Sequence, residues 1–288
     1  MVFINRAKIK FIKLSRMLLI PRGHLVLDVG SGDGPFARAN ILCDKYISET
    51  VNRVGPISID RPFVAGDILA LPFRDNSFDY IFCSHVLEHV DDPERALNEL
   101  MRVGKRGYIE MPSEFLEKLK CSPGHRWYVN INDSTLIFKE KERDVFDPFI
   151  QEVSESRLIN KDKSFMKFYW SNYYTIFNIA YEWSGKINFE IFRNTTIKPS
   201  ILQEQGLKKT EENRPDTEGI SLKIKAAIKS IIKIIYHKDI DLYELIACPI
   251  CKGSLELKEE KLFCYNCRKG YYIRDGIPIL IESYSFNI

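Results

Sequence analysis

The sequence has no long apolar run and none of the marks of a secreted protein. Its early apolar stretch, residues 17–20, is far shorter than the roughly 20 residues of a membrane-spanning helix, and no small-residue cleavage site follows it. Three of the seven cysteines, Cys43, Cys83 and Cys121, stand singly, so the spacing of a disulfide framework is also missing. We therefore predict a cytoplasmic protein with neither a signal peptide nor a membrane span.

Acidic residues are absent from two stretches of the chain. The formal net charge is only +3 at pH 7, but residues 1–24 carry six Lys or Arg, and residues 221–238 carry five Lys, with no acid in either. Both stretches have the spacing of amphipathic helices. They could contact an anionic membrane surface or RNA. Alternatively, their apolar faces pack on the domains while the lysines face water.

The 288 residues suffice for one domain of ordinary size and a smaller second one. Residues 25–111 alternate apolar runs with turn and helix signals, a pattern typical of βαβ units and a parallel sheet. A helix is expected from the start signal at 91–94 up to Gly104. The aromatic stretch 167–183 is compatible with helix or strand. The expected strands lie at 24–29, 40–43, 63–65, 80–83 and 108–111.

The predicted domains follow from these patterns. Residues 1–202 form the main domain, and residues 203–240 form a polar linker with one of the basic amphipathic helices. Residues 241–288 form a compact final unit.

A glycine-rich turn, VLDVGSGDG at 26–34, comes directly after the first expected strand. Small residues at that place let the backbone approach a ligand closely. Pro35-Phe36 stands where a phosphate-binding P-loop needs Gly-Lys-Ser/Thr, and the spacing G-x-G-x-G differs from the dinucleotide motif G-x-G-x-x-G. Taken alone, the turn is also compatible with an ordinary tight βα connection.

Further motifs follow the glycine turn in a fixed order: Gly66-Asp67, then Leu71-Pro72-Phe73, then Ser77-Phe78-Asp79, then HVLEHV at 85–90. With D-x-G-x-G-x-G they resemble the class I S-adenosylmethionine-dependent methyltransferases of the broad small-molecule type, over at least residues 24–113. The resemblance implies an α/β, Rossmann-like fold with a mostly parallel sheet, and S-adenosylmethionine as cofactor.

The resemblance also implies which residues bind the cofactor. The glycine turn would line the methionine end, Asp67 with Ile68 would meet the adenine, and Ser84 with His85 would lie over the sulfonium. An acid after the second strand would bind the ribose. The expected cofactor-binding residues are Asp28, Gly30, Ser31, Gly32, Asp44, Asp67, Ile68, Ser84 and His85.

Two acids compete for the ribose hydroxyls. Asp44 ends the apolar run 40–43, and Asp60 follows Ile57-Ser58-Ile59. We favour Asp44, because ANILCDK is typical of a strand that ends in an acid. That choice leaves room for little more than one helical turn at 35–39, which departs from the family.

His85, Glu88 and His89 form H-x-x-E-H, a motif that holds zinc in one class of peptidases when it lies on a long helix. Asp91-Asp92-Pro93 interrupts such a helix, so we assign the segment to the methyltransferase. His85, His89 and His125 are candidate general bases. Alignment and exclusion of water can suffice for methyl transfer, so His89 packing beneath the next helix and His125 as a plain loop residue remain alternatives.

Four cysteines predict a structural zinc site. Cys248-x2-Cys251 and Cys264-x2-Cys267 are two pairs able to close a tetrahedral four-thiolate centre with no open position. Gly253 and Arg268-Lys269-Gly270 suit the tight turns expected after each pair. The metal would hold together an α+β unit too small to build its own core.

The segment from Leu242 onward resembles the small zinc-ribbon proteins that bind and activate methyltransferases acting on tRNA and translation factors. Here it is fused to a methyltransferase, which implies stabilisation in cis. Contact of the ribbon with nucleic acid is an alternative, although residues 239–288 hold eight acids against six Lys or Arg.

We therefore expect a methyltransferase that acts on a small molecule or a saccharide and needs no obligate partner. A tRNA or protein acceptor is an alternative. So is a non-catalytic, cofactor-binding scaffold that activates another methyltransferase.

Overall fold

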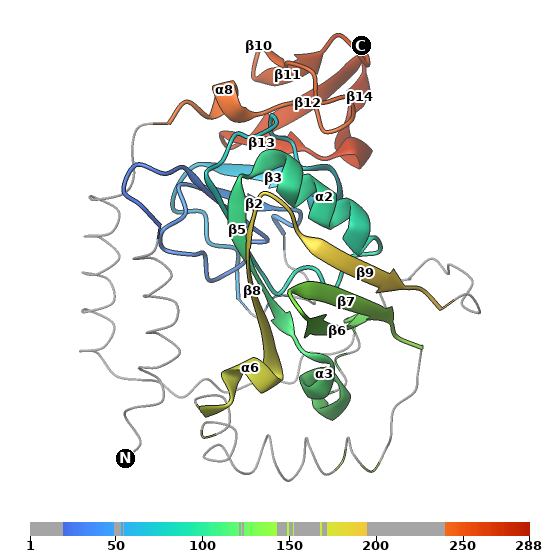
Figure 1. The fold of residues 1–288 in the computed structure, drawn as a ribbon. Helices are drawn as coiled ribbons and strands as arrows, with labels where there is room; N and C mark the ends of the chain where they lie inside the picture. Colours follow the sequence, from blue (N-terminus) through green and yellow to red (C-terminus); the bar gives the residue numbers. More distant parts are fainter. Residues whose placement is uncertain are drawn as a thin grey trace. The chain divides into compact units, whose positions relative to one another are not determined.

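The computed structural model describes residues 20–48, 53, 55–120, 122, 124–142, 149, 152, 168, 172–194 and 240–288 (Figure 1). Most of the predicted linker and both basic helices lie outside these residues. Contacts divide the chain into two compact units. We call residues 21–79 with 240–288 the ribbon-bearing unit and residues 80–194 the middle unit. The predicted domain limits and cytoplasmic location stay predictions. No helix in the described part of the chain has both the length and the apolarity to cross a bilayer.

A parallel sheet forms the core of the ribbon-bearing unit. Its strands β1 (Val26–Val29), β2 (Ile41–Asp44) and β3 (Phe63–Gly66) lie in the order β3-β2-β1. Leu27 pairs with Ile41, and Leu42 pairs with Phe63. Nearly every residue of the three strands is buried, which accounts for their continuous apolar runs.

The C-terminal segment of this unit is a small antiparallel sheet with two short helices. Its strands are β10 (Glu256–Lys258), β11 (Lys261–Cys264), β12 (Lys269–Arg274), β13 (Ile277–Leu280) and β14 (Phe286–Asn287). They lie in the order β10-β11-β12-β13, and β14 pairs with β12. Helix α8 (Leu242–Leu245) precedes them, and the 3-10 turn η3 (Glu282–Tyr284) follows β13.

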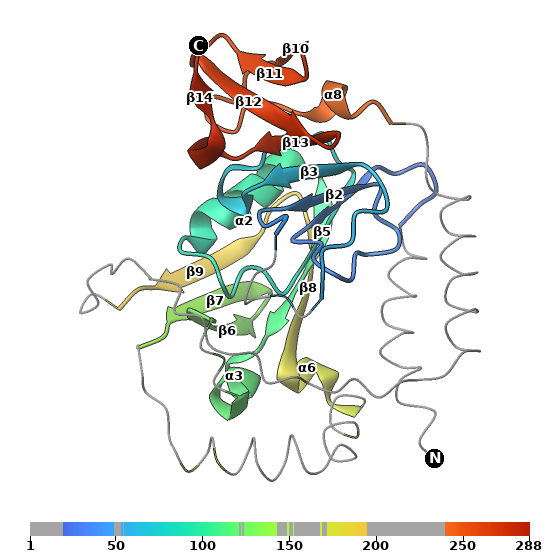
Figure 2. The ribbon, with the colours of Figure 1, turned by 180° about the vertical axis from the view of Figure 1, so that it is seen from behind.

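Strand β13 joins this ribbon to the parallel sheet. It pairs in parallel with β3, Ile279 opposite Ala65 and Leu280 opposite Gly66, so the sheet runs β13-β3-β2-β1 (Figure 1 and Figure 2). Leu280 is fully buried and Ile279 is only 4% exposed. The ribbon therefore covers an edge that would otherwise leave the polar backbone groups of β3 unpaired.

A second backbone contact strengthens this junction. Phe73 and Ile246 form an antiparallel bridge, Arg74 donates its N–H to Leu245 O at 2.9 Å, and Ala247 donates to Pro72 O at 2.9 Å. Lys252 Nζ donates to Leu71 O at 3.3 Å. The turn expected at Leu71-Pro72-Phe73 is therefore wrong: these residues form no turn, and Phe73 pairs with Ile246 of the ribbon instead.

The middle unit has one sheet that begins with two parallel strands. Strand β4 (Tyr80–Ser84) pairs in parallel with β5 (Arg106–Pro112), and β8 (Asn178–Ser184) pairs antiparallel on the other side of β5. Helix α2 (Pro93–Val103) connects β4 to β5. Asp92 caps it by accepting from Arg95 N, and Gly104 lies at its C-terminal end, as the sequence predicts.

A second, three-stranded sheet completes the middle unit. Strands β6 (Trp127–Asn132), β7 (Thr135–Glu140) and β9 (Asn188–Phe192) lie in the order β6-β7-β9. Helix α3 (Glu114–Lys120) follows β5. Short helix α6 (Tyr174–Phe177) leads directly into β8, so the described part of the aromatic stretch is helix first and strand afterwards.

The structure confirms the five predicted strands and the helix before Gly104, with differences only at their ends. No helix is assigned within residues 31–40, where the sequence leaves room for little more than one helical turn at 35–39. A single turn forms there, closed by Ala39 N donating to Phe36 O at 2.9 Å. Arg61 also binds this segment, because its Nη1 donates to the carbonyls of Phe36, Ala37 and Ala39 at 3.2, 3.3 and 2.7 Å.

Candidate functional site

The glycine turn follows β1 in a conformation that suits glycine. Gly30 and Gly32 have φ angles of 72° and 55°, which side chains disfavour. Gly30 N donates to Cys43 O at 2.8 Å, and Gly32 N donates to Asp44 Oδ2 at 3.0 Å. The turn is therefore held against the end of β2 before any ligand binds.

Two polar side chains in this turn have different surroundings. Asp28 is only 3% exposed and accepts from Phe36 N at 2.7 Å, which closes the loop around it. Ser31 is 5% exposed, and its hydroxyl has no hydrogen-bond partner among the residues that the structure describes. A buried hydroxyl without a partner is rare, so Ser31 fits a site whose ligand brings a polar group.

Asp44 and Asp60 also differ. Asp44 lies at the end of β2, where its Oδ2 accepts from Gly32 and its Oδ1 accepts from Tyr46 N at 2.9 Å. Asp60 is half-exposed and pairs with Arg61 at 2.7 Å. Of the two candidate ribose acids, Asp44 is therefore the one that contacts the glycine turn.

Asp67 follows β3 and caps the 3-10 turn η1 (Ile68–Ala70) by accepting from Leu69 N at 2.9 Å. Its other oxygen forms an ion pair with Lys45 Nζ at 2.8 Å. Ile68 beside it is buried. The carboxylate is thus fixed in orientation at the end of β3, next to an apolar side chain.

In the middle unit, Ser84 ends β4 and residues 85–90 form a turn. His85 itself has a φ of 58°. The H-x-x-E-H motif therefore lacks the helix that a zinc peptidase needs.

His85 contacts two carboxylates. Its Nδ1 lies 3.2 Å from Glu88 Oε1, and its Nε2 lies 3.6 Å from Glu110 Oε1. Glu110 also accepts from Tyr108 OH at 2.5 Å and from Ser84 Oγ at 3.3 Å.

These contacts set the charge of the pair. Burial by itself would lower the pKa of His85, but the hydrogen bonds to Glu110 and Glu88 outweigh it and raise that pKa to about 9. For Glu110, burial would raise the pKa, but hydrogen bonds from His85 and tyrosine hydroxyls lower it to about 2. His85 is thus held as an imidazolium, the protonation state that donates hydrogen bonds and cannot accept a proton.

His89 and His125 lie together. Their rings meet edge to face, with centroids 4.6 Å apart. His89 Nδ1 contacts Gly124 O at 2.9 Å, and His125 Nδ1 contacts Glu117 Oε2 at 2.5 Å. Glu117 is also paired with Lys141 at 2.5 Å. The structure therefore brings together two of the three predicted histidines, which lie on separate turns of the chain.

Sequence reasoning missed three acids at this place. Glu110 lies in β5, near its C-terminal end, and that position was the available signal. Glu88 lies inside the histidine motif but was assigned no role. Glu117 lies on α3 among several other charged residues, and no sequence pattern separates it from them.

The four predicted zinc ligands converge in the ribbon. Cys248 Sγ lies 3.4 Å from Cys267 Sγ, and Cys251 Sγ lies 3.4 Å from Cys264 Sγ. All four sulfur atoms lie within 4.8 Å of one another. Tetrahedral zinc with Zn–S bonds of 2.3 Å needs about 3.8 Å between sulfurs, so the cluster fits this metal.

The left-handed residues beside the cysteines are Lys252 and Arg268, with φ of 59° and 54°. Arg268 is the last residue of the turn at 265–268. Gly253 and Gly270 are needed for space. A Cβ on Gly253 would lie 2.6 Å from the Asn266 amide, and one on Gly270 would lie 2.2 Å from the Phe286 ring.

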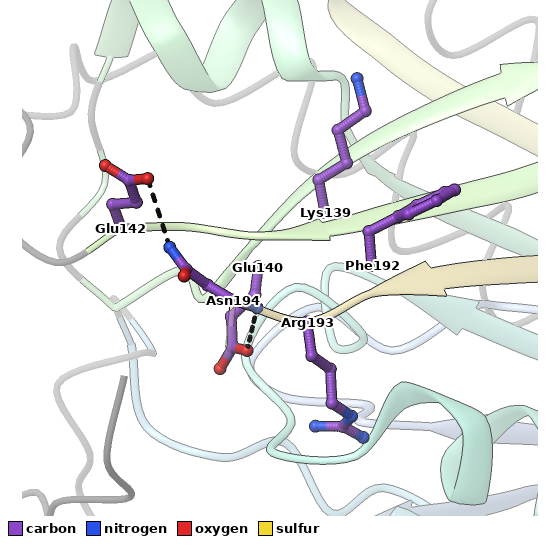
Figure 3. A pocket seen from close by; sticks show the side chains of 6 residues that line it. All are labelled: Lys139, Glu140, Glu142, Phe192, Arg193 and Asn194. Atoms are coloured by element: carbon purple, nitrogen blue, oxygen red, sulfur yellow. Dashed lines mark hydrogen bonds between the residues drawn. The ribbon is translucent and has the colours of Figure 1, made fainter. Parts of the chain in front are cut away.

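A hollow of about 450 Å³ lies elsewhere in the middle unit, at the ends of β7 and β9 (Figure 3). Asn194 N donates to Glu140 there, and Asn194 Nδ2 donates to Glu142. No predicted site residue lines it; its lining residues are Lys139, Glu140, Glu142, Phe192, Arg193 and Asn194.

Comparison with known proteins separates two parts of the chain. Residues 27–109 match the family model described as a methyltransferase domain, and residues 239–276 match that of Trm112p-like proteins. A demethylmenaquinone methyltransferase of Renibacterium salmoninarum is 40% identical over 99 residues, which cover 32% of this chain and 42% of that protein. The chain thus spans less than half the length of that relative.

The second part has short relatives. A UPF0434 protein of Methylobacillus flagellatus is 50% identical over 46 residues, which cover 15% of this chain and 77% of that protein. Among solved structures, the complex of the Haloferax volcanii Trm112 methyltransferase activator with a putative methyltransferase matches with 16% identity and a TM-score of 0.37. That match covers 62% of this chain and 89% of the other.

The glycine turn, the acids at the strand ends and the four clustered cysteines lie in the segments that these families match. Residues 27–109 therefore form a methyltransferase domain with a Rossmann-like fold, and residues 239–276 form a C-terminal Trm112p-like domain.

Proposed function

We propose that this protein transfers a methyl group from S-adenosylmethionine to a small-molecule or saccharide acceptor, with its zinc ribbon stabilising the cofactor-binding half in cis. The observation that carries this proposal is the prearranged glycine turn. Gly30 and Gly32 are fixed against β2, Asp44 lies beside them, and the buried Ser31 hydroxyl has no partner among the described residues.

Each strand end has a separate binding task in this proposal. The turn from Asp28 to Gly32 lines the methionine end of the cofactor, and Asp44 accepts from the ribose hydroxyls. Asp67 and Ile68 bind the adenine, the carboxylate through its amino group and the isoleucine through its ring face. The bound cofactor supplies an electrophilic methyl group, so the residues need to hold and orient rather than activate it.

In the middle unit, Ser84 and His85 are the residues that we assign to cofactor binding. His85 is held as an imidazolium by Glu88 and Glu110, so it positions oxygen atoms by donating hydrogen bonds. It does not remove the acceptor's proton in this arrangement.

The role of the ribbon rests on the junction. β13 pairs with β3, and β3 ends at the residue before Asp67. The second backbone contact holds residues 71–74, which follow η1. Loss of the ribbon would therefore expose the edge of β3 and free the segment that presents the adenine-binding acid.

Isothermal titration of S-adenosylmethionine tests the site. Asp44→Asn keeps the size of the side chain but removes its charge. Asp60→Asn makes the same change at the other candidate ribose acid and is the matched control. Because hydrogen bonds to a charged group contribute about 1.5–3 kcal/mol, we expect Asp44→Asn to weaken binding about 10- to 100-fold. Asp60→Asn should bind as the wild type does. Equal affinity of the two variants would refute the assignment, and no binding by the wild type would refute the function.

A second candidate acceptor is tRNA or protein, which the match to Trm112p-like proteins favours. Radiolabelled cofactor incubated separately with a metabolite extract, total tRNA and a protein extract decides between them. Label in the small-molecule fraction supports the leading proposal. Label only in tRNA or protein supports the second candidate, and cofactor binding without transfer to any fraction supports a scaffold role.

A further inference from the structure

Three side chains of the middle unit form a cluster that methyl transfer itself does not require. Glu88 and His89 come from the turn after β4, and His125 comes from the segment before β6. One ligand atom from each lies within 4.8 Å of the other two. They are two imidazoles and a carboxylate, which are ligand types for first-row divalent metals.

Glu88 provides the most informative atom. Glu88 is 1% exposed, and its Oε1 lies 3.2 Å from His85 Nδ1. Its Oε2 is buried and has no hydrogen-bond partner in the part of the chain that the structure describes. A buried carboxylate oxygen without a partner is costly, and a bound cation would remove that cost.

The two histidines are oriented as metal ligands usually are. His89 Nδ1 is held by Gly124 O at 2.9 Å, and His125 Nδ1 is held by Glu117 Oε2 at 2.5 Å. Such contacts place the proton on Nδ1 and leave the lone pair of Nε2 available. Glu117 is in turn fixed by Lys141, so the support of His125 extends by one more residue.

The spacing needs only a small adjustment. Bonds of about 2.1 Å from a metal to nitrogen or oxygen place ligand atoms no more than about 4.2 Å apart. Side-chain rotations that draw the three atoms together by roughly half an ångström close the site.

We propose that Glu88, His89 and His125 bind one divalent cation of the manganese-to-zinc series, in addition to the zinc of the ribbon. Three protein ligands leave coordination positions open. Those positions suit an acceptor that brings a hydroxyl or carboxylate oxygen. Such an acceptor would lie near His85, because Glu88 is only three residues further along the chain. This acceptor role rests on the proposed function, whereas cation binding does not.

Manganese titration tests the site in the full-length protein with one zinc already bound. Mn²⁺ prefers oxygen and imidazole ligands and does not displace zinc from four thiolates. Electron paramagnetic resonance of free Mn²⁺ gives the stoichiometry and affinity. We expect one Mn²⁺ per wild-type chain, and binding at least tenfold weaker in Glu88→Gln and in His89→Gln.

Glu114→Gln is the matched control, because Glu114 is a carboxylate of the same unit that pairs with Lys118 and Lys139 instead. It should bind Mn²⁺ as the wild type does. Pulsed resonance should also show imidazole nitrogen coupling that decreases in His89→Gln. Zinc content and the thermal midpoint show whether each variant is folded. If Glu88→Gln unfolds, His89→Gln still tests the site, because His89 is less buried than Glu88.

Absence of Mn²⁺, Co²⁺ and Ni²⁺ binding beyond the ribbon site would overturn the proposal. So would equal affinity of the wild type, Glu88→Gln and His89→Gln. Cofactor titration on the same samples keeps the two proposals apart, since S-adenosylmethionine binding depends on the glycine turn and does not require the cation.

Discussion

The cysteine cluster and the Glu88–His89–His125 cluster are the two groups of potential metal ligands among the described residues, and they differ in almost every property. The cysteines supply four soft ligands and leave no position open. The second cluster supplies three harder ligands and leaves positions open. The first type holds a small fold together, and the second type is suited to bind a further molecule.

The two clusters also differ in how they are built along the chain. Two Cys-x2-Cys pairs place their ligands by local turns, so their spacing is visible in the sequence. His125 joins Glu88 and His89 only because the segment before β6 returns to the turn after β4, where Arg126 N donates to Glu88 O at 2.7 Å. Structural sites built from local pairs can be read from sequence, whereas sites built from distant single residues need the fold.

Loss of zinc from the ribbon is expected to have the largest effect. Cys264→Ser removes one of four thiolates, and structural zinc contributes about 10 kcal/mol or more to the folding of small zinc domains. We expect this variant to contain no stoichiometric zinc and to lose amide protection in β13 and β3. Metal analysis and hydrogen exchange measure both effects.

Cys83→Ala is the control for that prediction, because Cys83 is a buried single cysteine of the middle unit. It should keep one zinc per chain. Full zinc content in Cys264→Ser would show that the ribbon folds without a four-thiolate centre. Protected β13 amides in a Cys264→Ser protein that contains no zinc would show the same.

Packing at the junction is expected to have a smaller effect that does not depend on the metal. Leu280 is fully buried in β13, and truncating a buried leucine to alanine costs about 2–5 kcal/mol. We expect Leu280→Ala to lower the free energy of unfolding by that amount and to retain zinc. Tyr284→Ala is the exposed neighbour, and it should change stability by less than about 0.5 kcal/mol. Chemical denaturation compares them, and equal midpoints would argue against the β13–β3 junction.

Crowding at Gly270 should give the smallest effect of the three. A methyl group there would lie 2.2 Å from the Phe286 ring, and overpacking of this kind costs about 1–3 kcal/mol. Gly270→Ala should therefore be destabilised, and adding Phe286→Leu should recover part of the loss. Gly34→Ala meets nothing within 4 Å and serves as the control. A stable Gly270→Ala protein with the same zinc content would show that β14 does not pack as described.

Much of the fold could be predicted because its signals are local. Buried strands appear as apolar runs, Asp92-Pro93 marks the start of α2, and Asp44 at the end of β2 has the type and place expected of a ribose acid. The contact of Arg61 with the carbonyls of Phe36, Ala37 and Ala39 could not be predicted, since Arg61 lies more than twenty residues further on. The β13–β3 pairing could not be predicted, because strand pairing between distant segments leaves no local pattern; the resemblance to activator proteins implied only stabilisation in cis.

The candidate site shows the same division. The histidine motif and the cysteines were visible, but the charge state of His85 depends on Glu110, which comes from the neighbouring strand β5. The unpartnered oxygen of Glu88 and the support of His125 by Glu117 are properties of packing. The need for glycine at 253 and 270 is likewise a property of packing, because a Cβ there would meet Asn266 and Phe286.

The central claim is that the zinc ribbon and the glycine turn belong to one folded unit, in which we propose that the turn binds the cofactor. The most direct measurement is calorimetric titration of S-adenosylmethionine into zinc-loaded protein, zinc-depleted protein and depleted protein with zinc restored. We predict binding by the first, loss of binding by the second and recovery by the third, because β13 supports β3 and the acid that follows it. Equal affinity of the zinc-loaded and zinc-depleted proteins would contradict the account.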